Sequence, residues 1–171
     1  SDVWKVIHLH LEIVARTSMS MLPEFEREHD GFLISTNQRR VDVEVVHEFL
    51  THSYWAAGIS RELVARSIEN SLCFGIYRGD RQVGFARVIS DYATFAYLAD
   101  VFVLEESRGK GLSKFLMQCI VEHPSLQGLR RWVLGTRDAH GLYAQFGFKP
   151  LHSPEIFMEI HNRDVYRPSN S

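Results

Sequence analysis

The 171-residue sequence contains only two cysteines and has a formal net charge of only -2. Cys73 and Cys119 both lie in apolar surroundings, which excludes a disulfide-rich scaffold and is typical of buried free thiols in a reducing compartment. Near-balanced charge provides no general attraction to nucleic acid or to anionic membranes. We therefore expect neither nucleic acid nor a membrane as a partner.

Long apolar runs are absent as well. No stretch approaches the roughly 18 to 20 apolar residues that span a membrane. The N-terminus lacks the basic region and apolar stretch of a secretion signal. The chain also contains no internal repeat and no low-complexity tract. These absences predict a cytoplasmic protein.

The chain does contain enough apolar sequence for one domain, with 45% hydrophobic and 12% aromatic residues. We expect an N-terminal extension and linker over residues 1–30, one folded domain over 31–160 and a tail over 161–171. Residues 3–15 fit a strand or a helix. We expect residues 1–22 to dock on the domain or on a second subunit, which leaves a homodimer open. His8, His10 and Glu12 lie there without a fourth ligand, so we expect no metal site.

The hydrophobic pattern from residue 31 onward predicts strands and helices in alternation. Asp42 and Ser60 are placed to cap the helices that follow them, and Gly147 ends a short helix that starts at Thr136 or Asp138. Strands are expected at residues 31–36, 72–77, 82–90, 97–104, 131–135, 148–151 and 156–160. Helices are expected at residues 42–50, 60–70 and 111–122, and a short fourth helix is expected from Thr136 or Asp138 to residue 146. The unit over 97–135 is expected to be a parallel crossover. The fold class is α/β (α+β), a single domain with a mixed, mostly antiparallel sheet flanked by helices.

One strand, turn and helix carry most of the functional prediction. The strand over 97–104 is apolar on both faces apart from Asp100, so we expect it to be buried on both faces. The turn after it contains two cations and two glycines, Arg108, Gly109, Lys110 and Gly111. The helix that follows begins with unpaired amide N–H groups. Such a turn is suited to hold an anion.

This turn and the later segment Leu-Tyr-Ala-Gln-Phe-Gly-Phe at 142–148 resemble the GNAT superfamily of acetyl-CoA-dependent N-acetyltransferases. The family's turn reads Gln/Arg-x-x-Gly-x-Gly/Ala, and Arg108, Gly111 and Ser113 occupy its fixed positions. Ser113 departs from the small final residue, but its hydroxyl adds a possible donor. The resemblance covers roughly residues 31–160 and implies the GNAT-like acyl-CoA N-acyltransferase fold. It also implies acetyl-CoA as co-substrate and no metal.

The resemblance further implies that the pyrophosphate of the cofactor binds at the turn, and that its pantetheine arm pairs with the preceding strand. Glycines let the backbone approach such a ligand closely, and the helix N-terminus and the cations favour its charge. Thr136 occupies a position where the family often has an asparagine that helps to hold the cofactor. The cofactor-binding residues implied are Val101, Phe102, Val103, Arg108, Gly109, Lys110, Gly111, Leu112, Ser113 and Thr136.

Acetyl transfer to an amine requires a neutral nucleophile and a proton for the departing thiolate. Tyr143 matches the family's general-acid position, and a tyrosine with a pKa of about 10 can donate that proton. The alternative interpretation is that Tyr143 is a half-buried residue that only contributes to packing. Asp100 is the carboxylate nearest to the turn and is a candidate general base, acting directly or through water. The alternative interpretation of Asp100 is a hydrogen-bonded acid with a structural role only. His140 lies on the same helix face as Tyr143 and is a second candidate base.

Acceptor specificity in this superfamily comes largely from the first helices and their loop. The substrate-binding candidates are therefore Tyr54 and Trp55 in that loop, with Arg137 and Asp138 at the other rim. Two adjacent aromatic residues are also typical of a core, so that alternative stays open. The acceptor is a small-molecule or peptide amine, and the sequence leaves its identity open.

We expect the amine to attack directly in a ternary complex, because neither cysteine has the setting of an acyl-carrying nucleophile. One rival function is a non-catalytic acyl-CoA binding or sensing module on the same fold. A second rival is a nucleotide-phosphate binding protein. The turn lacks the Gly-x-x-x-x-Gly-Lys-Ser/Thr spacing of that second class.

Overall fold

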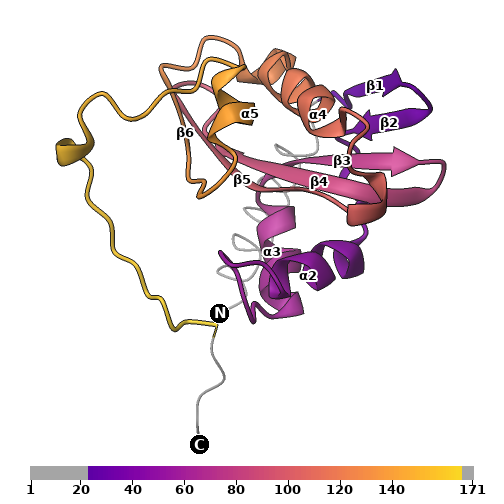
Figure 1. Ribbon diagram of the computed structural model, residues 1–171, viewed down its shortest axis with the longest axis horizontal. Helices are drawn as coiled ribbons and strands as arrows, with labels where there is room; N and C mark the ends of the chain where they lie inside the picture. The colour runs from indigo at the N-terminus through magenta and orange to yellow at the C-terminus, as the bar shows by residue number, and fades with distance from the viewer. Residues whose placement is uncertain (1–22, 167–171) are drawn as a thin grey trace, which may run out of the picture.

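The computed structural model describes residues 23–166 as a six-stranded sheet with helices on both faces (Figure 1). The strands follow one another across the sheet in chain order: β1 (Glu26–His29), β2 (Phe32–Ser35), β3 (Leu72–Arg78), β4 (Arg81–Ser90), β5 (Phe95–Val103) and β6 (Arg131–Leu134). Neighbouring strands are antiparallel except β5 and β6, which are parallel. The predicted mixed, mostly antiparallel sheet and its parallel crossover are therefore confirmed.

The helices form one layer on each face of this sheet (Figure 1). One layer holds α2 (Val43–Thr51) and α3 (Arg61–Glu69), and the other holds α4 (Leu112–Val121) and α5 (His140–Ala144). Short 3-10 turns cover Gln38–Arg40, Glu105–Ser107, Pro124–Leu126 and Pro154–Ile156. Each layer buries its own apolar cluster against the sheet. Within residues 23–166, no helix is long and apolar enough to cross a membrane.

The two helices of the first layer begin where the sequence predicts. The Asp42 carboxylate accepts hydrogen bonds from the backbone N–H groups of Glu44 at 2.9 Å and Val45 at 3.3 Å. The Ser60 hydroxyl accepts one from the N–H of Leu63 at 3.3 Å. Each side chain thus satisfies donors that the first helical turn leaves unpaired.

Helix α5 begins later than predicted. Its N-cap is Ala139, and the Thr136 hydroxyl instead accepts the Ala139 N–H at 3.0 Å in the preceding turn. Neither Thr136 nor Asp138 caps the helix, so that prediction is wrong. Gly147 follows the helix at a φ of 87°, as expected for a residue that ends one.

Strand β5 contains a β-bulge at Asp100, whose φ is 54°. Two residues of β5 lie opposite one residue of β4 there, which reverses the alternation of side chains. Leu98 and Val103 consequently share the α4 side of the sheet. Phe95 and Tyr97 are 39% and 36% exposed. The prediction of a strand buried on both faces is therefore wrong for its first half, and its uninterrupted alternation is wrong at the bulge.

The charged run at residues 24–30, predicted as a linker, forms strand β1 and pairs with β2. The sheet therefore begins at Glu26, before the boundary expected at residue 31. An edge strand tolerates such charges because one of its sides faces solvent. The Arg27 guanidinium contacts the Glu122 carboxylate at 2.6 Å, which ties this edge to the end of α4. The expected N-terminal extension, including His8, His10 and Glu12, lies outside the described residues.

The two last strands predicted, at residues 148–151 and 156–160, are absent from the sheet. The chain there is extended but pairs with no strand in the described part of the molecule, and its one regular turn is Pro154–Ile156. A strand exists only where another strand completes its ladder. The alternating pattern at residues 156–160 was therefore insufficient to predict a strand.

Both cysteines are buried free thiols, as predicted. Burial raises the pKa of Cys73 to about 12 and the pKa of Cys119 to about 11. At neutral pH each is an uncharged core residue, and the thiolate is the reactive form of cysteine.

The imidazole of His123 is buried, with 1% of the residue exposed, between the rings of Phe25 and Phe74. Its Nδ1 accepts the Ser125 N–H at 3.2 Å, so Nε2 carries the proton, and that group has no hydrogen-bond partner within the described residues. Burial lowers the pKa of this imidazole. The folded state therefore holds His123 neutral.

We expect the free energy of unfolding to fall by about 1 kcal/mol between pH 7.5 and 5.5 through His123. The unfolded histidine binds a proton below its ordinary pKa of about 6.5 while the buried one does not, so low pH favours unfolding. Urea unfolding of the wild type and of His123→Phe over this pH range measures the difference. The exposed variant His152→Gln is the control. An equal pH slope in wild type and His123→Phe would contradict the assignment.

Candidate functional site

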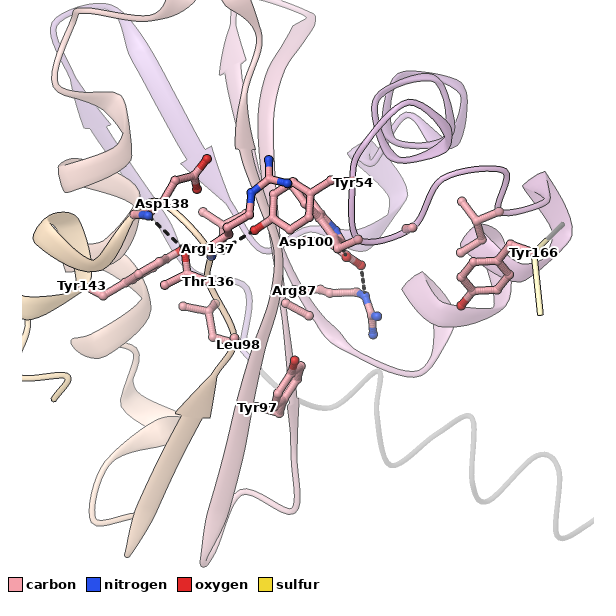
Figure 2. A pocket seen from close by; sticks show the side chains of 17 residues that line it. Tyr54, Arg87, Tyr97, Leu98, Asp100, Thr136, Arg137, Asp138, Tyr143 and Tyr166 are labelled. Atoms are coloured by element: carbon pink, nitrogen blue, oxygen red, sulfur yellow. Dashed lines mark hydrogen bonds and ion pairs between the residues drawn. The ribbon is translucent and has the colours of Figure 1, made fainter. Parts of the chain in front are cut away.

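The parallel strands β5 and β6 separate where the site lies. Their pairing runs from Phe95 with Arg131 to Leu98 with Leu134 and then stops. Beyond this point β5 bulges at Asp100, while the chain after β6 turns away toward α5. A cavity of about 670 Å³ opens between them, and Figure 2 shows side chains converging on it from both sides. Its walls are Tyr54, Trp55, Ala56, Ile59, Arg87, Tyr97, Leu98, Ala99, Asp100, Val101, Gly135, Thr136, Arg137, Asp138, Ala139, Tyr143 and Tyr166.

The glycine turn forms a second hollow of about 360 Å³ at the start of α4. Gly109 and Gly111 have φ angles of 75° and 74°, and a Cβ on either would meet no atom within 4 Å. Gly111 is the N-cap of α4, so the first amides of the helix open into this space. The backbone conformation of the turn and the unoccupied space beside it are thus suited to binding an anion. The hollow is lined by Val103, Ser107, Arg108, Gly109, Gly111, Leu112, Ser113, Lys114, Leu142 and Gln145.

The two cations of the turn brace its backbone. The Arg108 guanidinium donates through Nε to the carbonyl of Val103 at 3.0 Å. The Lys110 ammonium donates to the carbonyl of Glu106 at 3.1 Å. Their charge still lies beside the helix N-terminus, where it adds to the partial positive charge of the amides.

The end of β5 and helix α5 extend from one hollow to the other. Val101 borders the larger cavity and Val103 the smaller one, while Phe102 turns its side chain to the opposite face and stacks on Phe49 with ring centroids 3.9 Å apart. Only the main chain of Phe102 therefore faces this side of the sheet. β6 has already left β5 here, so the edge of β5 is free of a strand partner within the described residues.

Tyr143 lies on α5 and closes one side of the larger cavity (Figure 2). The residue is 8% exposed. Burial, with smaller contributions from Tyr54 and Asp138, raises the pKa of its hydroxyl to about 12. The hydroxyl therefore keeps its proton throughout the neutral range and can act as a donor.

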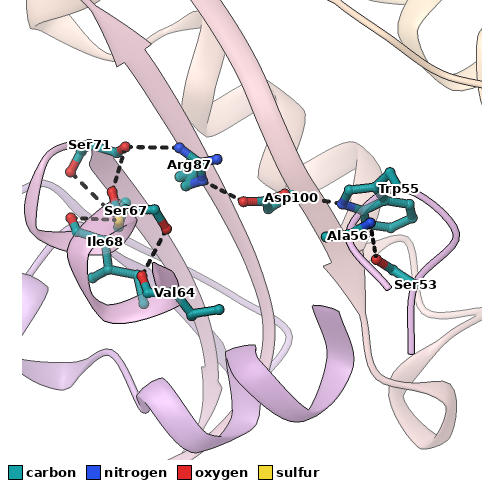
Figure 3. Close-up of polar contacts among 10 residues, drawn as sticks. Ser53, Trp55, Ala56, Val64, Ser67, Ile68, Ser71, Arg87 and Asp100 are labelled. Carbon is teal, nitrogen blue, oxygen red and sulfur yellow. Dashed lines mark hydrogen bonds and ion pairs between the residues drawn. The ribbon is translucent and has the colours of Figure 1, made fainter. Parts of the chain in front are cut away.

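Asp100 lies at the centre of a polar network beneath the opposite wall (Figure 3). One carboxylate oxygen accepts a hydrogen bond from Arg87 Nε, and the other accepts one from Trp55 Nε1 at 3.1 Å. Arg87 also donates to the Ser71 hydroxyl at 3.3 Å. The side chains of Asp100 and Arg87 are 8% and 18% exposed, so they form a largely buried ion pair on adjacent strands. The network ties the bulge of β5 to the loop after α2.

Tyr54 and Arg137 close the rim above the cavity (Figure 2). The guanidinium of Arg137 stacks 3.9 Å from the centroid of the Tyr54 ring, and its backbone N–H donates to the Tyr54 hydroxyl at 3.2 Å. Trp55 packs edge-on against Tyr54 with ring centroids 4.9 Å apart. The candidates from the two rims, which are 83 positions apart in the chain, are in direct contact.

The remaining sequence candidates divide into those at the cavity and one outside it. Thr136 and Asp138 line the larger cavity. His140 is exposed at the first position of α5 and is not among the lining residues. Among residues 23–166, no group of histidine, cysteine and acidic side chains is arranged to hold a metal ion.

Among the residues of the larger cavity that the sequence did not predict, three have polar groups: Arg87, Tyr97 and Tyr166. Arg87 had a detectable signal, because a lone charge within an otherwise buried strand usually has a partner. Asp100 is the matching lone charge in the next strand. Tyr166 carried no signal, since it comes from the expected tail and reaches the cavity only through the tertiary fold.

Comparison with known proteins identifies the family of the chain. The model of the acetyltransferase (GNAT) domain matches residues 69–150. The Gibberella zeae protein named "Putative acetyltransferase FG08082" is 30% identical in an alignment of 137 residues, and the match covers 67% of this chain and 76% of that protein. The residues that match the family model include the glycine turn.

Solved structures share the fold. A Xanthomonas campestris protein described as a putative acetyltransferase of the GNAT family is 51% identical, with a TM-score of 0.79, and the match covers 82% of this chain and 99% of that one. A predicted acetyltransferase from Clostridium acetobutylicum, solved with acetyl-CoA, is 13% identical with a TM-score of 0.55, over 81% of this chain and 96% of that one. The chain belongs to the GNAT family of acetyltransferases.

Proposed function

We propose that the protein is an acetyl-CoA-dependent N-acetyltransferase that acetylates a primary amine by direct attack in a ternary complex. The observation that carries this proposal is the cavity at the separation of β5 and β6. It brings the protonated hydroxyl of Tyr143, the carboxylate of Asp100 and the rim of Tyr54 and Arg137 together at one place. The anion-binding turn lies at the far end of the same strand.

The residues present fit the proposed cofactor. The empty space at Gly109 and Gly111 gives a pyrophosphate room to reach the first amides of α4, where a side chain would block it. The free edge of β5 near Val101 offers main-chain groups to an amide-containing arm. The acetyl-CoA in the Clostridium acetobutylicum structure supports the same ligand here, because the two folds agree.

Bound acetyl-CoA would supply an acetyl group activated as a thioester. Tyr143 is placed to donate its proton to the leaving sulfur, because its hydroxyl is protonated at neutral pH and borders the cavity. The rim of Tyr54, Trp55 and Arg137 would position the amine and limit its contact with water. The chain thus contributes orientation and a proton donor.

Asp100 would hold the amine rather than act alone as its base. Each carboxylate oxygen already accepts one N–H donor, and each has a second lone pair free to accept from an amine. An acyl-enzyme route is disfavoured, because both thiols are buried and their pKa values lie well above neutral pH. These features favour direct transfer.

The test is acetyl transfer by the full chain to a panel of amines, measured as thiol release together with the mass of the product. The panel includes α-amino acids, peptide N-termini, polyamines and lysine peptides. We expect at least one amine to accelerate thiol release and to gain an acetyl group. Tight binding of acetyl-CoA in a thermal-shift assay, with no thiol release for any amine, would instead identify a binding module. Stabilisation by ATP alone would contradict the cofactor assignment.

Gly109→Ala is expected to weaken acetyl-CoA binding about tenfold, which corresponds to about 1.4 kcal/mol. The new methyl group would enter the space open to the cofactor, and the φ of 75° would strain the turn. Gly128→Ala is the matched control, because Gly128 has a φ of 74° and equally open space but lies outside the site. Isothermal titration of both variants with acetyl-CoA measures the effect. Equal weakening in both variants would assign it to backbone strain.

A further inference from the structure

A second large hollow, of about 780 Å³, lies between helix α2 and the loop that follows it. Most of its surface is apolar and comes from Val45, Phe49, Leu104, Tyr54 and Trp55. Tyr54 and Trp55 are 49% and 41% exposed, although both carry large aromatic rings. Contiguous exposed apolar surface of this kind marks an interaction site in a folded protein. We refer to this hollow as the α2 groove.

The α2 groove and the larger cavity share one wall. Tyr54, Trp55 and Arg137 line both of them. The indole N–H of Trp55 donates to the Asp100 carboxylate on the cavity side at 3.1 Å. Its ring lies 6.2 Å, between centroids, from the ring of Phe49 in the groove. A molecule that reacts beside Asp100 and extends past this wall therefore enters the groove.

The apolar side of the groove is held in place by the core. The Phe49 ring stacks on the buried Phe102 ring with centroids 3.9 Å apart. Phe49 and Leu104 both pack on the apolar cluster of α2 and α3. A preformed apolar hollow gains affinity from an apolar group without the cost of ordering its own walls. The groove thus fits a large, uncharged side chain.

Arg137 lies where the two hollows meet and has a charge that the protein leaves unpaired. Its guanidinium lies 3.9 Å from the centroid of the Tyr54 ring (Figure 2). No carboxylate within residues 23–166 forms an ion pair with it. A guanidinium held against a ring binds a carboxylate through two parallel hydrogen bonds. The junction of the hollows is therefore suited to a ligand carboxylate.

The groove also contains carboxylates of its own, and these restrict what enters it. Glu44 and Glu48 line the groove but not the larger cavity. Glu44 is paired with Arg61, whereas the ion-pair partner of Glu48 among the described residues is His52, at 3.6 Å. An acidic side chain in the groove would meet like charge there, which selects against it.

We propose that the acceptor is a free α-amino acid with an aromatic or large aliphatic side chain, an inference that rests on the N-acetyltransferase function proposed above. Its amine lies toward Asp100, its carboxylate pairs with Arg137 and its side chain fills the α2 groove. The three groups branch from one carbon, just as the cavity, the guanidinium and the groove meet at one wall. An amine without a carboxylate would leave the charge of Arg137 unpaired.

The transfer itself is balanced by groups already described. The amine nitrogen bonds to the acetyl carbonyl carbon as the carbon–sulfur bond breaks. The sulfur takes the proton of the Tyr143 hydroxyl, and the proton that the nitrogen loses returns through solvent to the Tyr143 oxygen. The products are the N-acetyl amino acid and the CoA thiol.

The first test compares kcat/KM for L-phenylalanine with that for close analogues. 2-Phenylethylamine lacks the carboxylate and phenylalaninamide lacks its charge, so each should be about 50-fold poorer. L-Alanine lacks the ring and should be about 30-fold poorer. L-Glutamate should be poorer still, because its side chain faces Glu48. Equal kcat/KM for phenylalanine and either carboxylate analogue would overturn the proposal and assign the acceptor to plain amines or to peptide N-termini.

The second test changes Arg137. In Arg137→Met the preference for phenylalanine over 2-phenylethylamine should fall to about one, because the carboxylate has lost its partner. Arg130→Met removes the same charge from an exposed position that lines neither hollow, and it should keep the wild-type preference. Circular dichroism checks that each variant is folded. An unchanged preference in folded Arg137→Met would overturn the proposal.

The third test changes the groove. Val45→Glu should reduce the preference for phenylalanine over alanine at least tenfold, because a carboxylate then occupies the space of the side chain. Ala57→Glu is the control, since it adds the same group at an exposed position of the neighbouring loop outside both hollows. An equal preference in wild type and folded Val45→Glu would show that the side chain does not enter the groove.

Calorimetric titration of phenylalanine in the presence of CoA separates this proposal from the proposed function. Binding that weakens in Arg137→Met, without thiol release for any amine, would support the amino-acid site and contradict acetyl transfer. Thiol release with another amine, while phenylalanine neither binds nor reacts, would overturn the amino-acid site and retain the N-acetyltransferase function.

Discussion

Tyr143→Phe is expected to lower kcat by a factor of about 100 or more, with nearly unchanged affinity for acetyl-CoA. The substitution keeps the ring that packs against Phe148 and removes only the hydroxyl. Because burial holds the pKa of that hydroxyl at about 12, the wild type donates a proton at neutral pH and the variant has none to give. Steady-state kinetics with saturating amine, together with calorimetric titration of acetyl-CoA, measure the two effects separately.

Tyr97→Phe is the matched control for this prediction. Tyr97 lines the same cavity, and its hydroxyl lies 3.7 Å from the position of a Cβ on Gly135. Both variants lose one phenolic hydroxyl from one cavity, so a general change in polarity would affect them alike. Loss of turnover only in Tyr143→Phe assigns the proton donor. Unchanged turnover in Tyr143→Phe would remove this residue from the mechanism.

The pH dependence of turnover provides a further check of the same assignment. With a pKa of about 12, Tyr143 stays protonated below pH 10, so its ionisation should leave the pH profile of kcat flat on the alkaline side up to that point. A fall in kcat between pH 8 and 9 that disappears in Tyr143→Phe would contradict the raised pKa.

The sequence predicted those parts of the fold in which local chemistry decides the backbone. Asp42 and Ser60 cap their helices because a short polar side chain next to unpaired N–H groups has one favourable arrangement. The glycine turn was predictable for the same reason, since Gly109 and Gly111 adopt φ angles open mainly to glycine. In these places, interactions between residues close together in the sequence determine the backbone conformation.

The parts that the sequence did not reveal depend on distant partners. The bulge at Asp100 is stabilised by contacts of its side chain with Arg87 on the adjacent strand and with Trp55 on a loop. The alternation of side chains along the strand sequence does not reveal such a bulge. Strand β1 was missed because an edge strand can be as charged as a linker. Residues 156–160 were expected to form a strand, but a ladder requires a partner that one described copy lacks.

Asp100→Asn is expected to lower the free energy of unfolding by about 3 kcal/mol. Asparagine tolerates the φ of 54° and retains the shape of the side chain, so the substitution removes mainly the charge. Arg87 is then left largely buried with its charge unpaired, and that uncompensated charge is the costly state. Urea unfolding at pH 7 measures the loss. Glu44→Gln is the control, because the pair of Glu44 with Arg61 is 65% and 51% exposed and should contribute less than about 1 kcal/mol.

A double-mutant cycle with Arg87→Met separates the structural and functional roles of Asp100. Each single variant should be destabilised, whereas the double variant should recover most of the lost stability because it buries no unpaired charge. If Asp100 holds the acceptor amine, the stable double variant will still have a raised KM for the amine and a reduced kcat, with acetyl-CoA affinity unchanged. Recovery of kcat and KM together with stability would show that the carboxylate serves the fold alone. The bulge that shapes the cavity would then be the whole contribution of this ion pair to the site.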